Sequence, residues 1–295
     1  MNNNIKAVLL ATIASFCAVL MSVFLKLAQH DANVFTVGFL RFLFGLFIIL
    51  PFIINSKFTI YKTNNFKFHL SRSILNVPMM ILGFAALMYI PLEQIKAIGF
   101  LSPIIVVIMS VIILKERIYI IRILALIIGF IGVIIILRPG IIAINVGAYM
   151  VLLSGLLWST VIIITKFMSK EDSPMTILTY QYSLVTLFTL PLALFFWTHP
   201  SFDTILFSIL AAITGTILHL CINHSYRLAD LSVIQPVWFT QLVFASFFGF
   251  TIFGEIPDGW TWAGGILVFS SVLIITYREN YLKKDIAKKS IPLKS

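Results

Sequence analysis

The stretch Tyr89-Ile-Pro-Leu-Glu-Gln-Ile-Lys-Ala-Ile-Gly-Phe-Leu-Ser-Pro103 leads into an apolar run that ends at Leu114-Lys-Glu-Arg117, and a second apolar run then reaches Leu137-Arg-Pro-Gly140. Each run is long enough to cross a bilayer, which takes about 20 apolar residues in a helix. The short polar interruption between them therefore predicts a tight connection between two membrane-spanning helices.

The same pattern returns in the second half of the chain. Tyr226-Arg-Leu-Ala-Asp-Leu-Ser-Val-Ile-Gln-Pro236 opens an apolar run, Phe253-Gly-Glu-Ile-Pro257 interrupts it, and a final run ends at Tyr277. Glu116 and Glu255 thus occupy equivalent points, each between two apolar runs. We interpret the chain as one unit of about five segments that is used twice.

The composition is that of a membrane protein. Apolar residues make up 60% of the 295 residues and charged residues only 11%, whereas a soluble domain carries about a quarter charged residues. The two cysteines, Cys17 and Cys221, lie in apolar runs of opposite halves, so we interpret them as small buried residues and expect neither a disulfide nor a metal site. The first apolar run is longer than the core of a signal peptide, and we interpret it as a retained span.

At about 20 residues per membrane-spanning helix, the chain holds ten predicted spans. Their approximate bounds are 5–28, 34–54, 70–90, 94–114, 118–138, 146–167, 175–197, 204–226, 231–253 and 260–277. The predicted fold class is an all-α polytopic membrane protein with ten transmembrane helices in two five-helix repeats. The first repeat covers residues 1–140, the second covers residues 141–280, and residues 281–295 form a basic cytoplasmic tail.

The distribution of Lys and Arg predicts the orientation, because these residues accumulate in cytoplasmic connections. With the N-terminus inside, seventeen of the 21 Lys and Arg residues fall on the cytoplasmic side, and only Lys96 and Arg138 fall outside. Lys26 and Arg41 lie within spans. We therefore expect both termini in the cytoplasm, and the net charge of +10 requires no nucleic-acid partner. The basic tail is expected to lie against anionic membrane lipid.

This orientation also predicts that the two repeats are inverted. Glu116 falls in a cytoplasmic connection and Glu255 in an external one, because an odd number of spans separates the halves. Inverted repeats of this kind recur in secondary transporters, where the binding site lies near the midplane between the halves.

Several motifs, weak singly but specific as a set, resemble the EamA-like transporters of the drug/metabolite transporter superfamily. They are Gly38-Phe-Leu-Arg-Phe42, Arg72-Ser-Ile-Leu75, Leu87-Met-Tyr-Ile-Pro91, Ala97-Ile-Gly-Phe-Leu-Ser-Pro103, Lys115-Glu-Arg117, Tyr226-Arg-Leu-Ala-Asp230 and Gly254-Glu-Ile-Pro-Asp-Gly-Trp-Thr-Trp262. The resemblance implies a permease of the inner (plasma) membrane, with a cavity lined by helices one to four and six to nine. Helices five and ten would be peripheral. The ninth span lacks an equivalent of Pro103, so we expect the halves to bend differently.

The acidic residues argue against an enzyme. Nearly all eleven lie in connections or in the tail, and only Glu93 touches the end of a span. The sequence has no paired carboxylates at helical spacing, no metal motif rich in Asp and no phosphate-binding Gly-Lys-Ser/Thr loop. We interpret His30-Asp31 as a polar turn. No catalytic residue, metal or cofactor is expected.

Polar residues within the spans identify the candidate site, because such residues usually face the interior of a helix bundle. Aromatic side chains would stack on a substrate, and amides or imidazoles would orient its polar groups. The predicted substrate contacts are Tyr89, Trp158, Tyr180, Gln181, His219, Asn223, Gln235 and Trp238. The predicted charges of the pathway are Lys26, Arg41, Glu93 and Lys96. Prolines at positions 78, 103, 191 and 236 are expected to bend the helices.

Each of these residues also has a purely structural interpretation. Lys26 and Lys96 are near span ends, where they would extend to the membrane surface. Arg41 would tie backbone carbonyls or Glu93, and His219 and Trp238 would be packing residues. If the cations do face the pathway, they outnumber Glu93 and favour substrates with a carboxylate or phosphate group.

The leading hypothesis is a secondary transporter of a small organic metabolite that works by alternating access. A passive channel and, less favoured, a membrane-embedded enzyme are the alternatives. Because only Glu93 approaches a span, uniport or exchange ranks above proton symport. The family resemblance covers amino acids, nucleoside-like compounds, vitamins and S-adenosylmethionine, so the sequence leaves the substrate, the direction, the coupling and a homodimer open.

The charge bias makes a direct prediction about the C-terminus. A reporter that is active only after export, fused behind Ser295, should be silent, because seventeen basic residues hold that side of the protein in the cytoplasm. The measurement is reporter activity in whole cells, with a fusion after the first predicted span as the exported control. Strong activity behind Ser295 would overturn the orientation.

Overall fold

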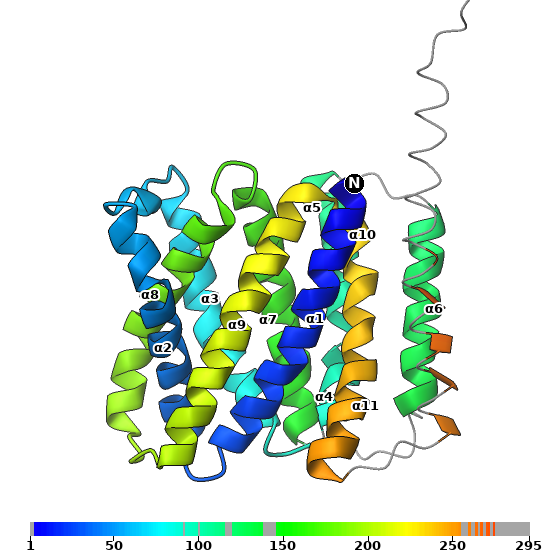
Figure 1. The fold of residues 1–295 in the computed structure, drawn as a ribbon. Helices are drawn as coiled ribbons and strands as arrows, with labels where there is room; N and C mark the ends of the chain where they lie inside the picture. Colours follow the sequence, from blue (N-terminus) through cyan, green and yellow to red (C-terminus); the bar gives the residue numbers. More distant parts are fainter. Residues whose placement is uncertain are drawn as a thin grey trace, which may run out of the picture.

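Every regular element that the structure, a computed structural model, describes is a helix (Figure 1). The described residues are 3–90, 92–99, 101–115, 120–137 and 146–254, together with scattered residues between 259 and 274. The predicted all-α class is confirmed for this part of the chain. The basic tail 281–295, Glu116, Glu255, Arg138 and most of the expected tenth span lie outside the described residues.

The helices follow one another along the chain with short connections. Their bounds are α1 Asn3–Ala28, α2 Val34–Asn55, η1 Thr59–Tyr61, α3 Phe66–Ala86, α4 Leu92–Gly99, α5 Leu101–Leu114, α6 Ile120–Leu137, α7 Val146–Met168, α8 Pro174–Phe195, α9 Phe202–Leu228, α10 Leu231–Ile234, η2 Gln235–Phe239 and α11 Thr240–Phe253. Within the described ranges, six stretches are long and apolar enough to cross a membrane: α1, α2, α7, α8, α9 and residues 231–253. The chain is therefore a multi-pass membrane protein.

Local sequence explains where several helices begin. Asn33 precedes α2, and its side-chain oxygen accepts hydrogen bonds from the N–H groups of Phe35 and Thr36. Ser173 does the same for Thr176 at the start of α8, and Ser201 caps α9. Such caps satisfy N–H groups that have no partner inside the helix, a requirement that becomes strict in a bilayer.

The predicted ninth span 231–253 is not one continuous α-helix. It consists of α10, the 3-10 segment η2 and α11. Pro236 accounts for the change, because proline has no N–H to donate and its ring clashes with the preceding turn. The predicted fourth span 94–114 is described as α4 and α5 on either side of Phe100, which lies outside the described residues. Pro78 and Pro191 lie inside α3 and α8, whereas the side chain of Pro103 lies outside the described part.

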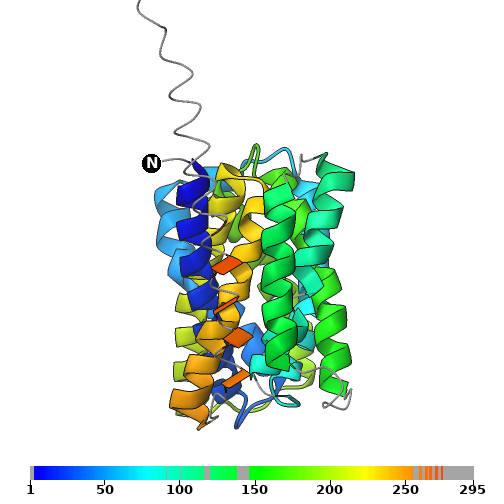
Figure 2. The same cartoon turned by 90° about the vertical axis from the view of Figure 1, so that its right-hand side faces the viewer.

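The helices form one bundle with α6 at its edge (Figures 1 and 2). We call the end that holds the N-terminus and the α2–α3 and α7–α8 connections the N-terminal face, which is uppermost in Figure 1. The other end, with the α1–α2 and α8–α9 connections, is the opposite face. Large apolar side chains such as Ile112 and Phe195 are more than two-thirds exposed on the outside of the bundle, as expected for a surface in contact with lipid.

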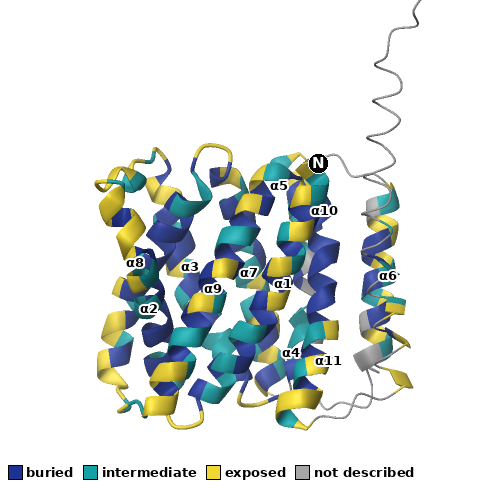
Figure 3. Cartoon of the chain, in the orientation of Figure 1, coloured by how far each residue is buried: buried dark blue, intermediate teal, exposed yellow. Residues whose placement is uncertain are grey.

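Contacts between the two halves of the chain dominate the packing. Helix α1 runs along α9, with hydrogen bonds from Ser225 to the carbonyl of Ala7 at one end and from Thr204 to the carbonyl of Ala28 at the other. Helix α3 packs on α7, and α2 packs on α8. Figure 3 shows the buried residues on the inward sides of these helices, so the core lies between the halves.

The α2–α8 contact predicts a position that tolerates no added carbon atom. A Cβ at Gly45 would lie 2.6 Å from the ring of Tyr182, and that ring is held by a hydrogen bond to Thr216 and an edge contact with Phe42. Gly45→Ala should therefore destabilise the protein by about 1–3 kcal/mol, seen as a lower melting temperature in detergent. Gly99→Ala is the control, because its Cβ meets no atom within 4 Å. Equal melting temperatures for the two variants would contradict the close packing.

Candidate functional site

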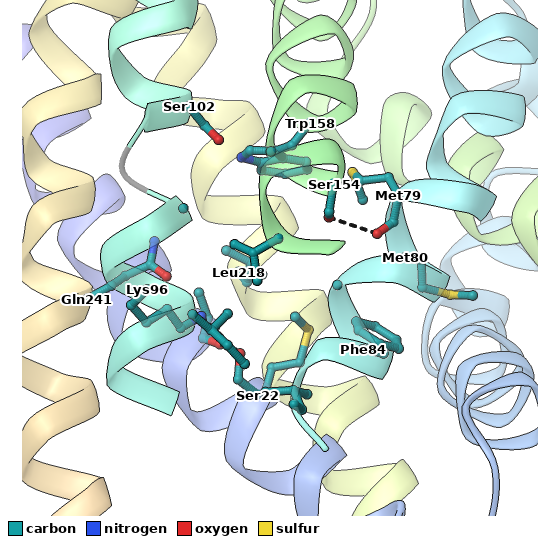
Figure 4. A pocket seen from close by; sticks show the side chains of 18 of the residues that line it. Ser22, Met79, Met80, Phe84, Lys96, Ser102, Ser154, Trp158, Leu218 and Gln241 are labelled. Atoms are coloured by element: carbon teal, nitrogen blue, oxygen red, sulfur yellow. Dashed lines mark hydrogen bonds between the residues drawn. The ribbon is translucent and has the colours of Figure 1, made fainter. Parts of the chain in front are cut away.

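A central cavity of about 240 Å³ lies between the two halves of the bundle. Side chains from α1, α2, α3, α4, α5, α7, α9, η2 and α11 line it. Its polar and tryptophan side chains are Ser22, Arg41, Asn76, Lys96, Ser102, Ser154, Trp158, His219, Gln235, Trp238 and Gln241. Figure 4 shows Lys96 and Gln241 on one wall, with Met80 and Phe84 on the wall across from them.

The cavity offers flat and polarisable surfaces. Trp158 and Trp238 meet edge to face, with ring centroids 6.3 Å apart and planes at 89°. Met79 and Met80 add thioether groups to the lining. Aromatic faces and adaptable methionines suit a ring-bearing ligand.

Arg41 is a buried cation at the cavity wall, 1% exposed. Its guanidinium lies 4.1 Å from the ring centroid of Phe42 and 5.6 Å from that of Tyr182. Its Nη2 atom contacts Met21 Sδ at 3.4 Å, while Nε and Nη1 have no hydrogen-bond partner. Gly215 makes room for this group, because a Cβ there would lie 2.4 Å from Nη2. The sequence-based alternative of a tie to backbone carbonyls is therefore not what the geometry shows.

Lys96 is the second cation of the cavity. Its Nζ donates to the hydroxyl of Ser22 at 3.0 Å, and that hydroxyl donates to the carbonyl of Ala18. Since Arg41 touches Met21 and Lys96 touches Ser22, both cations meet α1 at the same turn. Among the described side chains, no carboxylate forms an ion pair with either cation. Glu93 lies in α4, but its side chain is outside the described part of the protein.

A chain of hydrogen bonds leads from the cavity into the bundle. Arg72 donates to Thr165 at 2.7 Å and to the Oε1 of Gln181 at 2.9 Å. This orients the amide so that Gln181 Nε2 faces His219 Nε2 at 3.3 Å. An amide nitrogen can only donate, so His219 Nε2 accepts and its proton lies on Nδ1, which has no partner. Asn223 is buried one turn further along α9 and does not line the cavity.

The N-terminal face is closed by buried polar contacts. Asp172, only 6% exposed, accepts hydrogen bonds from Thr63 at 2.8 Å, Asn65 at 3.2 Å and His69 Nε2 at 3.1 Å. Tyr180 stacks on His69, with ring centroids 4.2 Å apart, and donates to a carbonyl of η1. These contacts join the α2–α3 connection of the first half to the α7–α8 connection of the second.

The opposite face has both buried and solvated contacts. Thr198 of the α8–α9 connection donates from its N–H group to the hydroxyl of the buried Thr36 at 3.1 Å and accepts a hydrogen bond from the N–H group of Asn33. Asp31 accepts hydrogen bonds from His30 at 2.8 Å and Ser201 at 3.1 Å, and these hold the pKa of its carboxyl below the usual value. The Asp31 side chain is 47% exposed. A second cavity of about 410 Å³ opens nearby, and Leu87 lines both cavities. The second cavity is also lined by Lys26 and by Tyr89, which is 59% exposed.

The structure brings part of the predicted site together. Trp158, His219, Gln235 and Trp238 line the central cavity, as do Arg41 and Lys96. Gln181 and Asn223 lie behind its wall, Tyr180 is at the N-terminal face, and Tyr89 and Lys26 lie at the second cavity. Sequence reasoning did not select Asn76, Ser102 or Ser154, although Asn76 lies one turn from Arg72 on a polar face of α3. The described residues contain no cluster of three or more metal ligands.

Comparisons with known proteins show what the chain is similar to. The sequence profile of the EamA-like transporter family matches residues 5–138 and again residues 145–277. A riboflavin transporter of Vibrio cholerae is 31% identical over 87% of this chain and 86% of its own length. An S-adenosylmethionine uptake transporter of Rickettsia prowazekii is 27% identical over 97% and 96%. One crystal structure superposes with a TM-score of 0.73 at 15% identity, covering 90% of this chain and 98% of the other, which shows a shared fold.

The two faces predict different sensitivities to loss of a carboxylate. Asp172→Asn should destabilise the protein by about 2–4 kcal/mol, because three donors lose a buried charged acceptor. The readout is the melting temperature in detergent. Asp31→Asn is the matched control and should change it little, since solvent screens that exposed group. A larger effect at Asp31 would contradict the greater burial of the Asp172 contacts.

Proposed function

Because the chain belongs to the EamA-like transporter family, we propose that it is a secondary transporter that carries a small organic metabolite across the inner membrane by alternating access. The observation that supports this most is the central cavity itself. Both halves of the chain line it, and different sets of contacts join the halves at the two faces of the protein. A relative movement of the halves would expose the cavity to one side at a time.

Equivalent local features in the two halves support an inverted repeat. Arg41 lies eight residues after the cap Asn33, and Gln181 lies eight residues after the cap Ser173; both are buried. Lys115 and Gly254, which end the helices before Glu116 and Glu255, both have positive φ angles, of 56° and 69°. The two matches of the family profile divide the chain at the same place, which supports repeats over 1–140 and 141–280.

The closing contacts of the two faces are also related. Asp31, between α1 and α2, binds Ser201 just before α9. Asp172, between α7 and α8, binds Asn65 just before α3. If the halves are related by a two-fold axis in the membrane plane, these are the same contact at opposite faces. This symmetry and the bias of Lys and Arg support ten spans with the N-terminal face in the cytoplasm.

The second cavity at the opposite face supports a state that is closed toward the cytoplasm. The contacts of Asp172 are buried, whereas those of Asp31 are solvated. The second cavity adjoins the central one at Leu87 on the opposite side. Transport then requires that the contacts of Asp172 open while Leu87 and its neighbours close.

The chemistry of the cavity supports a ring-bearing, polar substrate. The tryptophan pair offers aromatic edges and faces, and His219 and Gln235 offer hydrogen bonds. Relatives of this chain are named as a riboflavin transporter and an S-adenosylmethionine uptake transporter, and both compounds join a ring system to polar groups. They are the first substrates to test, and the membrane lipid is the other expected partner.

Uptake into proteoliposomes tests this function. We expect saturable uptake of radiolabelled riboflavin or S-adenosylmethionine that accelerates when unlabelled compound is present on the far side, as carriers but not channels behave. Trp158→Ala and Trp238→Ala should reduce the rate at least about tenfold, since stacking on both rings is lost. Trp197→Ala, in the exposed connection after α8, is the control.

Two results would contradict the proposal. Uptake that rises linearly with concentration and shows no stimulation from the far side would indicate a channel. Chemical alteration of the recovered compound, absent from empty liposomes, would indicate an enzyme.

A further inference from the structure

Arg41 is a buried cation, and its contacts within the protein do not offset the full free-energy cost of its burial. A charged arginine at the centre of a membrane-spanning helix costs about 2.5–3.5 kcal/mol even on the mildest scales. Buried cations normally recover this cost from an ion pair or from hydrogen bonds to every donor. Arg41 is 1% exposed, and two of its three nitrogens have no partner. Its contacts with Phe42 and Tyr182 offset only part of the cost.

Arg72 shows what a purely structural arginine looks like in this protein. It is also buried, but it lies behind the cavity wall and donates to two side-chain oxygens, on Thr165 and Gln181. Arg41 has instead a single hydrogen-bond partner, Met21 Sδ, and a thioether is a weak acceptor. The two residues are on neighbouring elements of the same half, so the difference lies in their position relative to the cavity.

Other lining residues of the cavity also have buried hydrogen-bond donors without a partner. The buried atoms without partners on its described lining residues are all nitrogens. Two of them, on Gln235 and Trp238, lie close to the hydroxyl of Tyr226, which can accept a hydrogen bond from them. The remaining ones are Arg41 Nε and Nη1, Asn76 Nδ2 and His219 Nδ1, and His219 Nδ1 carries a proton for the reason given above. The buried lining atoms that remain without a partner are therefore hydrogen-bond donors.

An anionic oxygen group on the ligand supplies what is missing. We propose that the substrate carries a carboxylate or phosphate group that binds the guanidinium of Arg41 in the central cavity. Such a group only accepts hydrogen bonds and carries the opposite charge, and arginine binds it through two parallel N–H bonds. Met21 has a flexible side chain, and its sulfur is displaced from Nη2. This inference rests on the proposed function, because it assigns the substrate class of the same cavity.

Lys96 and the tryptophan pair offer further contacts to the proposed anionic substrate. Lys96 reaches the same turn of α1 from α4 and has donors left after its bond to Ser22, because an ammonium group has three. It adds a second positive charge to the lining of the cavity, and no described carboxylate forms an ion pair with either cation. A substrate with its anionic group at α1 then extends its ring toward Trp158 and Trp238 across the cavity.

The first test needs no ligand and measures the melting temperature of the purified full-length protein. Arg41→Met removes the unpaired charge and should leave the melting temperature unchanged or raise it, because a site kept for binding is held at a cost in stability. Arg72→Met, the matched control, should lower it, because Thr165 and Gln181 lose their donor. A fall for Arg41→Met as large as that for Arg72→Met overturns the proposal in favour of a structural arginine.

The second test measures binding with pairs of probes that differ only in charge. The pairs are N-acetyltryptophan with its amide, and riboflavin 5′-phosphate with riboflavin, so that the first pair tests a carboxylate and the second a phosphate. The anionic member should bind wild-type protein about tenfold more tightly or better. The preference should vanish in Arg41→Met and persist in Lys67→Gln, which removes an exposed cation at the start of α3. Equal binding of the pairs, or a preference that survives in Arg41→Met, overturns the proposal.

The transport function and the role of Arg41 can be contradicted separately. If uptake is saturable for a neutral or cationic compound and the anionic probes do not compete, the transporter function stands and the role of Arg41 is wrong. If uptake shows no saturation with any compound, the transporter function is wrong, and the binding of the paired probes to wild-type protein and to Arg41→Met then decides whether Arg41 holds an anion.

Discussion

A bilayer offers no water to unpaired polar groups, and this constraint organises the whole protein. Backbone N–H and C=O groups must find partners within the chain, which is why the described part is helical and why Asn33, Ser173 and Ser201 cap the helices that follow them. Polar side chains obey the same constraint by facing inward. The polar groups that form the site are therefore the same groups that the lipid forces into the interior of the bundle.

The inward-facing polar groups divide into two classes. Arg72 and Asp172 each form hydrogen bonds with side chains of the other half, so these groups hold helices of the two halves together and close the N-terminal face. Around the central cavity, donors on Arg41 and His219 have no hydrogen-bond partner. Satisfied networks stabilise one conformation, whereas an unsatisfied cavity is completed by what enters it. A carrier needs both, since it must close one face and still release its cargo.

The sequence predicted the helical class and many of the spans because apolar length is a local property. It also selected Trp158, His219, Gln235 and Trp238, since polar or aromatic residues at helical spacing show which face of a helix points inward. It could not show how deep each residue lies. Tyr89 and Tyr180 are aromatic residues of predicted spans, as Trp158 is, yet they lie at opposite faces of the protein. The partners of Arg41 and Arg72 also differ through contacts between distant segments, which spacing within one helix does not reveal.

The central claim is that one cavity between two halves opens to each side in turn. The most direct measurement is a pair of distances between spin labels in the same protein preparation, in lipid nanodiscs, with Cys17 and Cys221 replaced. One pair, at Lys62 and Lys170, spans the N-terminal face, and the other, at Met88 and Thr251, spans the opposite face beside the second cavity. Alternating access predicts that addition of a transported compound lengthens one distance while it shortens the other. Two distances that stay fixed, or that lengthen together, would contradict it.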